Sequence, residues 1–126
     1  MDFQLEITQR MKMEKTVLEN NPDLREMLDL FGKHQKLTRS QVRTYTGFSD
    51  RKARTLIREL RQTILPNRRG ETIVNLPSTH VYELTADPVK IETYRLYLQS
   101  YVDSFLQDLN SLRNAGRVQA EMQLEC

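Results

Sequence analysis

The chain has 126 residues, a length typical of one domain with appended helices, and its hydrophobic fraction of 38% allows only a modest core. A mean hydropathy of −0.64, the lack of an apolar run of about 18 residues and an acidic N-terminus argue against a membrane span or a signal peptide. The single cysteine, Cys126, excludes an internal disulfide, and His34 and His80 have no ligand-like spacing. We therefore expect a cytoplasmic protein without a metal or a cofactor.

The net charge of +2 conceals a strong asymmetry along the chain. Residues 1–35 carry five basic and seven acidic side chains, residues 36–70 carry ten and two, and residues 71–126 carry four and eight, which gives −2, +8 and −4. A solvated surface usually mixes its signs, so a basic block between acidic flanks indicates a polyanionic partner. Such a block can also serve solubility alone, so charge by itself does not assign the partner.

Two helices are predicted in the first third of the chain. Residues 4–20 show an apolar stripe that includes Met11 and Leu18, with charges elsewhere. Asn21 suits an N-cap and Pro22 suits the first helical position, so a second helix begins there and ends at Gly32 or Lys33. Its apolar side chains are Leu24, Met27, Leu28, Leu30 and Phe31.

A short third helix is predicted after Leu37. Thr38 is its expected cap, Val42 and Tyr45 form its buried side, and Gly47 ends it. Phe48 is the expected core anchor of the turn that follows.

A basic amphipathic helix follows that turn, from Asp50 to about Gln62 with Ser49 as its cap. Two short helices around a tight turn are typical of a helix-turn-helix, whose second helix enters the DNA major groove, where arginine matches the acceptors of guanine. The apolar stripe consists of Ala53, Leu56, Ile57 and Leu60. The candidate DNA-binding residues here are Ser49, Arg51, Lys52, Arg54, Thr55, Arg58 and Gln62, and Arg39 and Arg43 are candidates for backbone contacts.

The next segments change from helical to extended patterns. Their β-branched residues, prolines and turn residues predict strands and loops. A strand is expected at residues 63–66, a turn at 67–70, an extended loop at 71–79 with a possible hairpin around 72–74, and a returning strand at 80–84 with Val81 or Tyr82 facing inward.

A long helix is predicted from Asp87-Pro88 to about Ala115, ended by Gly116. It would be about 40 Å long, too long for a small core to cover, so the N-terminal helix, a second copy or another protein must shield its apolar stripe. A seven-residue repeat favours a coiled-coil-like seam and a homodimer. The candidate dimerisation residues are Ile91, Tyr94, Leu98, Tyr101, Phe105, Leu109 and Leu112.

The stretch LTRSQVRTYTGFSDRKARTLIREL (residues 37–60), followed by Ile64-Leu65-Pro66 and Val81-Tyr82-Glu83-Leu84, resembles the winged-helix DNA-binding proteins of phage and prophage early regions. In that family a β-hairpin wing follows the helix-turn-helix, and a final helix often follows the second strand. The resemblance implies that Arg51 and Arg58 lie on the recognition helix and that Arg68 and Arg69 lie on the wing.

These observations predict a mainly α fold with a small β-hairpin, in which a winged helix-turn-helix domain at residues 21–86 follows an N-terminal helical arm at 1–20. A long C-terminal helix at 87–115 and a tail at 116–126 complete the chain. We expect a non-enzymatic, sequence-specific double-stranded DNA-binding protein, a transcriptional regulator or replication accessory factor of a phage or mobile element. The alternative is a protein-interaction module without specific DNA binding, an adaptor or inhibitor of a host or viral complex.

Overall fold

The computed structural model describes residues 2–76 and 79–125, and Cys126 lies outside the described residues. The chain divides into two compact units, Met1–Ile91 and Glu92–Cys126. Within the described residues, helices predominate and a small antiparallel sheet accompanies them, which confirms the predicted mainly α class. None of the described helices combines the length and the apolar character that crossing a bilayer requires.

The first two helices are as predicted: α1 spans Asp2–Asn20 and α2 spans Pro22–Lys33. Asn21 separates them because its Oδ1 accepts the backbone N–H of Leu24 at 3.1 Å, which satisfies one of the free donors at the start of α2. Leu18 at the end of α1 packs against the core, and the apolar side chain of Met11 earlier in α1 is exposed.

The third helix, α3 (Arg39–Thr46), follows a short strand, β1 (Lys36–Thr38), that was not predicted. Thr38 caps α3 in a reciprocal capping box with Gln41, and each side chain accepts a backbone N–H of the other residue. Val42 is buried as predicted, but the prediction for Tyr45 is wrong, because its side chain is 53% exposed. Tyr45 stacks instead on His34, with 5.0 Å between the ring centroids.

The fourth helix, α4 (Asp50–Glu59), continues through a π-helical turn, η1 (Leu60–Ile64), and a 3-10 turn, η2 (Leu65–Asn67). The predicted strand at residues 63–66 is therefore wrong. β-branched residues favour strands only weakly, and tertiary packing overrides that preference. Leu60, Ile64 and Leu65 are all buried, and the wider π turn allows all three to face the core.

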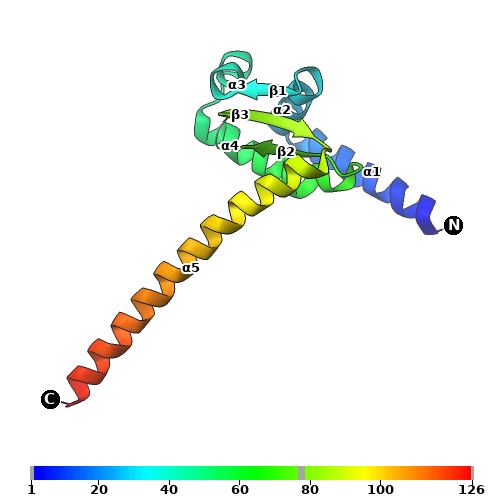
Figure 1. Ribbon diagram of the computed structural model, residues 1–126. Helices are drawn as coiled ribbons and strands as arrows, with labels where there is room; N and C mark the ends of the chain where they lie inside the picture. Colours follow the sequence, from blue (N-terminus) through cyan, green and yellow to red (C-terminus); the bar gives the residue numbers. More distant parts are fainter. Residues whose placement is uncertain (1, 77–78, 126) are drawn as a thin grey trace. The chain divides into compact units, whose positions relative to one another are not determined.

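The sheet consists of β1, β2 (Thr72–Asn75) and β3 (Val81–Thr85), in the order β1-β3-β2 (Figure 1). Both pairings are antiparallel, with Leu37 opposite Tyr82 and Ile73 opposite Leu84. Strand β3 lies one residue later than predicted, and of the two alternatives it is Tyr82 that is buried. Strand β2 takes up four residues of the predicted extended loop at 71–79, where the hairpin around 72–74 is expected, and residues 77–78 of that loop lie outside the described part.

The last helix, α5, spans Pro88–Glu125 and begins as predicted, because Asp87 Oδ1 accepts the backbone N–H of Val89 at 2.9 Å. The predicted end at Gly116 is wrong, and residues 116–125 continue the helix. One glycine inside a helix costs only about 1 kcal/mol. The residues after Gly116 are mostly good helix formers, which offset that cost.

Candidate nucleic-acid interface

Helix α4 is fixed by its apolar side, which determines the side chains that face outward. Ala53, Leu56 and Ile57 are buried in the core against α2, as predicted. Because an α-helix has 3.6 residues per turn, the residues about half a turn away from these three lie on the opposite side. The exposed side chains of that side are Arg51, Arg54, Thr55 and Arg58.

The turn before α4 holds the two short helices in a defined relation. Gly47 ends α3 in the left-handed region at φ 74°, and its backbone N–H donates to the carbonyl of Arg43 at 2.8 Å. Phe48 is half-buried and packs against the core, and Ser49 Oγ accepts the backbone N–H of Lys52 at 3.2 Å. Three residues therefore join α3 to α4 with a cap on each side, as the sequence predicts.

Two arginines on the outer face of α4 are uncommitted. Within residues 2–76 and 79–125, the guanidinium groups of Arg51 and Arg58 have no hydrogen-bond or ion-pair partner. Arg54 Nε donates to the carbonyl of Asp50 at 3.4 Å, and Thr55 Oγ1 donates to the carbonyl of Arg51 at 3.0 Å. The Thr55 oxygen can still accept a hydrogen bond, and each arginine offers several donors.

Lys52 differs from these arginines because its ammonium group interacts with other side chains of the same chain. Its Nζ lies 2.7 Å from a carboxylate oxygen of Asp23 in α2 and 4.5 Å from the centroid of the Phe48 ring. An ammonium group in this position stabilises the packing of α4 on α2. Gln62, the last candidate of this stretch, lies in η1 and is exposed.

The two basic candidates on α3 also differ in whether they have a partner. Arg43 Nη2 lies 2.9 Å from Asp50 Oδ2, so this ion pair joins α3 to the first residue of α4. Arg39, at the start of α3, is exposed and has no partner among the described residues. All guanidinium donors of Arg39 therefore remain available to a phosphate of the DNA backbone, whereas Arg43 uses part of its donors in the ion pair with Asp50.

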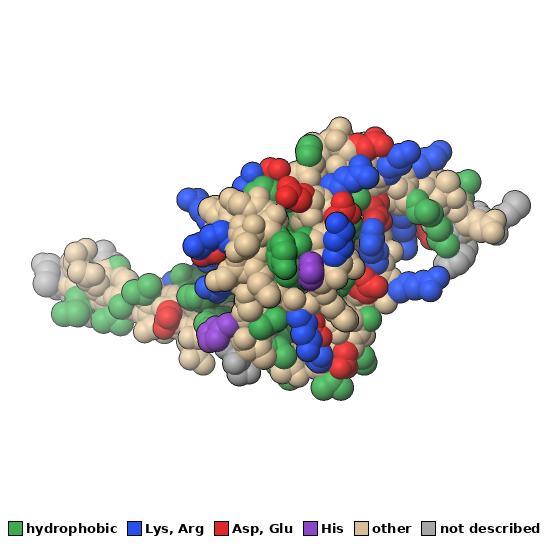
Figure 2. Space-filling model, turned by 90° about the horizontal axis from the view of Figure 1, so that it is seen from above, with side chains coloured by type: hydrophobic (Ala, Val, Ile, Leu, Met, Phe, Trp, Pro, Cys, Tyr) green, Lys and Arg blue, Asp and Glu red, His purple; other side chains and the backbone are tan. Residues whose placement is uncertain are grey.

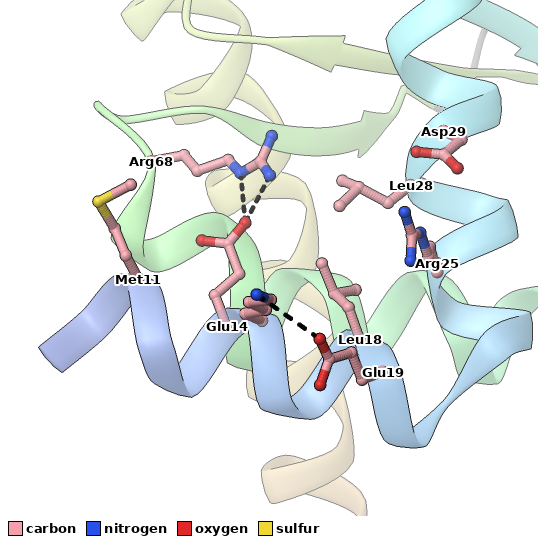
Figure 3. A pocket seen from close by; sticks show the side chains of 9 residues that line it. Met11, Glu14, Leu18, Glu19, Arg25, Leu28, Asp29 and Arg68 are labelled. Atoms are coloured by element: carbon pink, nitrogen blue, oxygen red, sulfur yellow. Dashed lines mark hydrogen bonds and ion pairs between the residues drawn. The ribbon is translucent and has the colours of Figure 1, made fainter. Parts of the chain in front are cut away.

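The predicted placement of Arg68 and Arg69 on a hairpin is wrong, because the hairpin runs from β2 to β3 and both arginines precede it. Arg68 lies against α1, where Nε donates to Glu14 Oε1 at 3.1 Å and Nη2 donates to the same oxygen (Figure 3). This pair borders a cleft of about 360 Å³ between α1 and α2, into which Leu18 and Leu28 point. Arg69 is exposed in the turn before β2.

In the folded chain, acidic side chains thus balance part of the positive charge of the basic block at residues 36–70. At least four of its ten basic side chains form ion pairs, and three of the four acidic partners named below come from outside the block. Basic and acidic side chains are interspersed on the face of the molecule seen in Figure 2. The pairs are Lys36 with Glu83, Arg43 with Asp50, Lys52 with Asp23, and Arg68 with Glu14.

Outside this surface, no group of three His, Cys, Asp or Glu side chains suited to a metal gathers in the described part of the chain. His34 is occupied by its stacking on Tyr45. His80 precedes β3 with φ 54°, a left-handed backbone conformation that is uncommon for a residue with a side chain.

The candidate dimerisation residues lie along α5, and most of them are exposed. Ile91 and Tyr94 are half-buried. A contact that the sequence did not reveal joins Tyr97 to Tyr101, whose hydroxyl oxygens are 2.8 Å apart. This hydrogen bond, with a smaller effect of desolvation, raises the pKa of Tyr97 above its usual value of 10.0. The exposed candidates are Leu98, Tyr101, Phe105, Leu109 and Leu112.

The chain matches no known protein family, no curated protein and no solved structure. We therefore assign roles to these residues from their own geometry and chemistry.

Proposed function

We propose that residues 22–85 form a winged helix-turn-helix that binds double-stranded DNA in a sequence-specific manner, with α4 in the major groove. Helices α3 and α4, the β2–β3 hairpin and α5 follow one another in the order that the resemblance implies. The wing is then the β2–β3 hairpin, and its connection at residues 76–80 contains no lysine or arginine. The proposal therefore gives the wing a small role and assigns the base contacts to α4.

The single observation that carries this proposal is the pair of uncommitted arginines, Arg51 and Arg58, on the side of α4 opposite the core. They lie seven positions apart, which is a rise of about 10 Å along the helix. Successive bases of one strand are about 3.4 Å apart, so the two arginines span about three base steps. Each guanidinium offers the planar fork that guanine accepts in the major groove.

We infer from these features a non-enzymatic role as a transcriptional regulator or a replication accessory factor of a phage or mobile element. Both roles require the protein to find one site among many competing ones. Phosphate contacts fix the register of a protein on DNA but carry no sequence information, so the discrimination falls to side chains that reach the base edges. The proposal assigns that task to Arg51 and Arg58, with Thr55 between them on the same helix.

The test begins with selection of random duplex DNA on the full chain at about 0.15 M salt. With the selected site in hand, Arg58→Ala is compared with Arg10→Ala by fluorescence anisotropy. Arg10 is exposed on α1, so its variant makes the same change in charge away from the interface. If Arg58 reads a base, its loss costs about 1–3 kcal/mol and relaxes the preference at one position, because a bidentate contact discriminates by that amount.

The remaining outcomes are equally informative. An equal loss on all sequences, with a salt slope reduced by about 0.9, identifies Arg58 as a phosphate contact. Unchanged binding of Arg58→Ala removes this residue from the interface. Weak, sequence-blind and salt-labile retention of the unaltered chain contradicts the proposal and favours the protein-interaction module.

A further inference from the structure

We propose that the Glu92–Cys126 unit pairs with the same unit of a second copy as a parallel, in-register, two-stranded coiled coil. The seam would consist of five apolar side chains of α5: Leu98, Val102, Phe105, Leu109 and Leu112. This inference goes beyond DNA binding and does not depend on it, because its residues and its test concern only α5.

The spacing of these five residues is that of a coiled-coil seam. They alternate by four, three, four and three positions, so Val102 and Leu109 occupy the a sites of a heptad and the other three occupy the d sites. Their exposed fractions lie between 42% and 72%. Each Å² of apolar surface left in water costs about 25 cal/mol of free energy.

The seam has a defined length, about 21 Å from Leu98 to Leu112 at the rise of a helix. Continuing the same spacing places Arg95 one step before the seam and Gly116 one step after it. Arg95 is charged, and its guanidinium forms an ion pair with Glu92. Gly116 has no side chain. Both positions therefore end the apolar contact.

The residue types at part of the seam favour two strands over three or four. In parallel coiled coils, a β-branched residue at a with leucine at d favours the two-stranded form. Val102 supplies the β-branched a site, and Leu98 and Leu112 supply leucine at d. A self-complementary stripe is also what a two-fold symmetric dimer requires, because each copy presents the same surface to the other.

Charge complementarity supplies an independent argument. In this phase Asp108 occupies a g site and Arg113 occupies the e site five residues later, the two sites that carry interhelical salt bridges in coiled coils. Neither side chain has a partner among the described residues. A parallel in-register pair brings Asp108 of each copy to Arg113 of the other, twice by symmetry. An antiparallel pair faces g with g and e with e, and does not bring these charges together.

The first test is the mass of the full chain in solution by sedimentation equilibrium over a range of about 1–100 μM, the range of a moderate affinity. The unaltered chain should approach twice the 14.9 kDa of one chain. Leu109→Gln should weaken dimerisation at least about tenfold, whereas Leu96→Gln should not. Leu96 is a matched control, because it is exposed on the same helix but outside the seam. Circular dichroism checks that both variants retain their helix.

The second test addresses the orientation. Asp108→Arg and Arg113→Asp should each weaken the homodimer by placing like charges together. A mixture of the two variants should form a heterodimer, because both pairs between positions 108 and 113 then join opposite charges. An unaltered chain that stays monomeric at every concentration overturns the proposal. A dimer that Leu109→Gln does not weaken overturns the seam, and variants that fail to recombine overturn the parallel orientation. DNA binding by α4 is measured separately, so either proposal can fail alone.

Discussion

Gly47 should be the glycine whose replacement most clearly destabilises the turn between α3 and α4. Its φ of 74° lies in the left-handed region, where a Cβ costs about 1–2 kcal/mol. No atom lies within 4 Å of a Cβ built there, so the cost is purely conformational. Alanine also restricts the unfolded chain, which returns about 0.4–1 kcal/mol. Gly47→Ala should therefore lower the free energy of unfolding by about 1 kcal/mol.

Gly32 in α2 provides the matched control for this substitution. A Cβ at Gly32 also meets nothing within 4 Å, but the residue is helical, so Gly32→Ala should stabilise the protein by about 0.5–1 kcal/mol. Urea unfolding of both variants measures the difference, about 2 kcal/mol, with its linear dependence on denaturant. Equal stabilities for the two variants would refute a left-handed Gly47. Gly47→Asn should recover part of the loss, because asparagine tolerates this conformation.

Two further predictions concern single hydrogen bonds. Ser49→Ala removes the cap of α4 and should cost about 1 kcal/mol in urea unfolding, and a stability equal to that of the unaltered chain would show that the cap contributes nothing. Tyr101→Phe should lower the pKa of Tyr97 towards 10.0 in an alkaline titration that follows the Tyr97 ring signals by NMR, and an unchanged pKa of Tyr97 would contradict the hydrogen bond. Because the pKa of Tyr97 is raised in the folded chain, the stabilisation from this bond is lost as the pH rises through that pKa.

The helix boundaries that could be predicted from the sequence are those set by local chemistry. Asn21, Thr38 and Ser49 each cap the helix that follows by a hydrogen bond within three residues, and Gly47 ends α3 by its own conformation. Nothing distant is needed to identify such a signal. The same holds for the apolar side of α4, whose spacing alone predicts its burial.

The elements that the sequence did not predict correctly depend on distant contacts. Strand β1 exists because Leu37 pairs with Tyr82, 45 positions later in the chain. The π turn that replaces the predicted strand at residues 63–66 is held by Arg61, whose Nε donates to the carbonyl of Ile73 at 2.7 Å. Neither contact leaves a periodic pattern in the sequence.

The same reason limits prediction of the site. Arg51, Arg58 and Lys52 have equal standing in the sequence as basic residues of one helix. Only the fold brings Asp23 to Lys52 and leaves the two arginines without partners among the described residues. The predicted wing position of Arg68 is wrong because residues 63–66 are helical and the hairpin begins only at β2, and no sequence pattern indicates that Arg68 pairs with Glu14, 54 positions earlier.

The pairing within the basic block also bears on how DNA could be recognised. On α3 and α4, the basic side chains outside ion pairs are Arg39, Arg51, Arg54 and Arg58. If all four met phosphates, the logarithm of the affinity would fall with that of the salt concentration at a slope of about −3.6, well short of the −9 that ten contacts would give. One copy would therefore bind DNA weakly through phosphate contacts alone. Every arginine that contacts a base instead of a phosphate lowers the number of phosphate contacts further. Specific binding by such a surface requires either strong base contacts from α4 or a second copy that doubles the interface, which is the arrangement that the seam on α5 would supply.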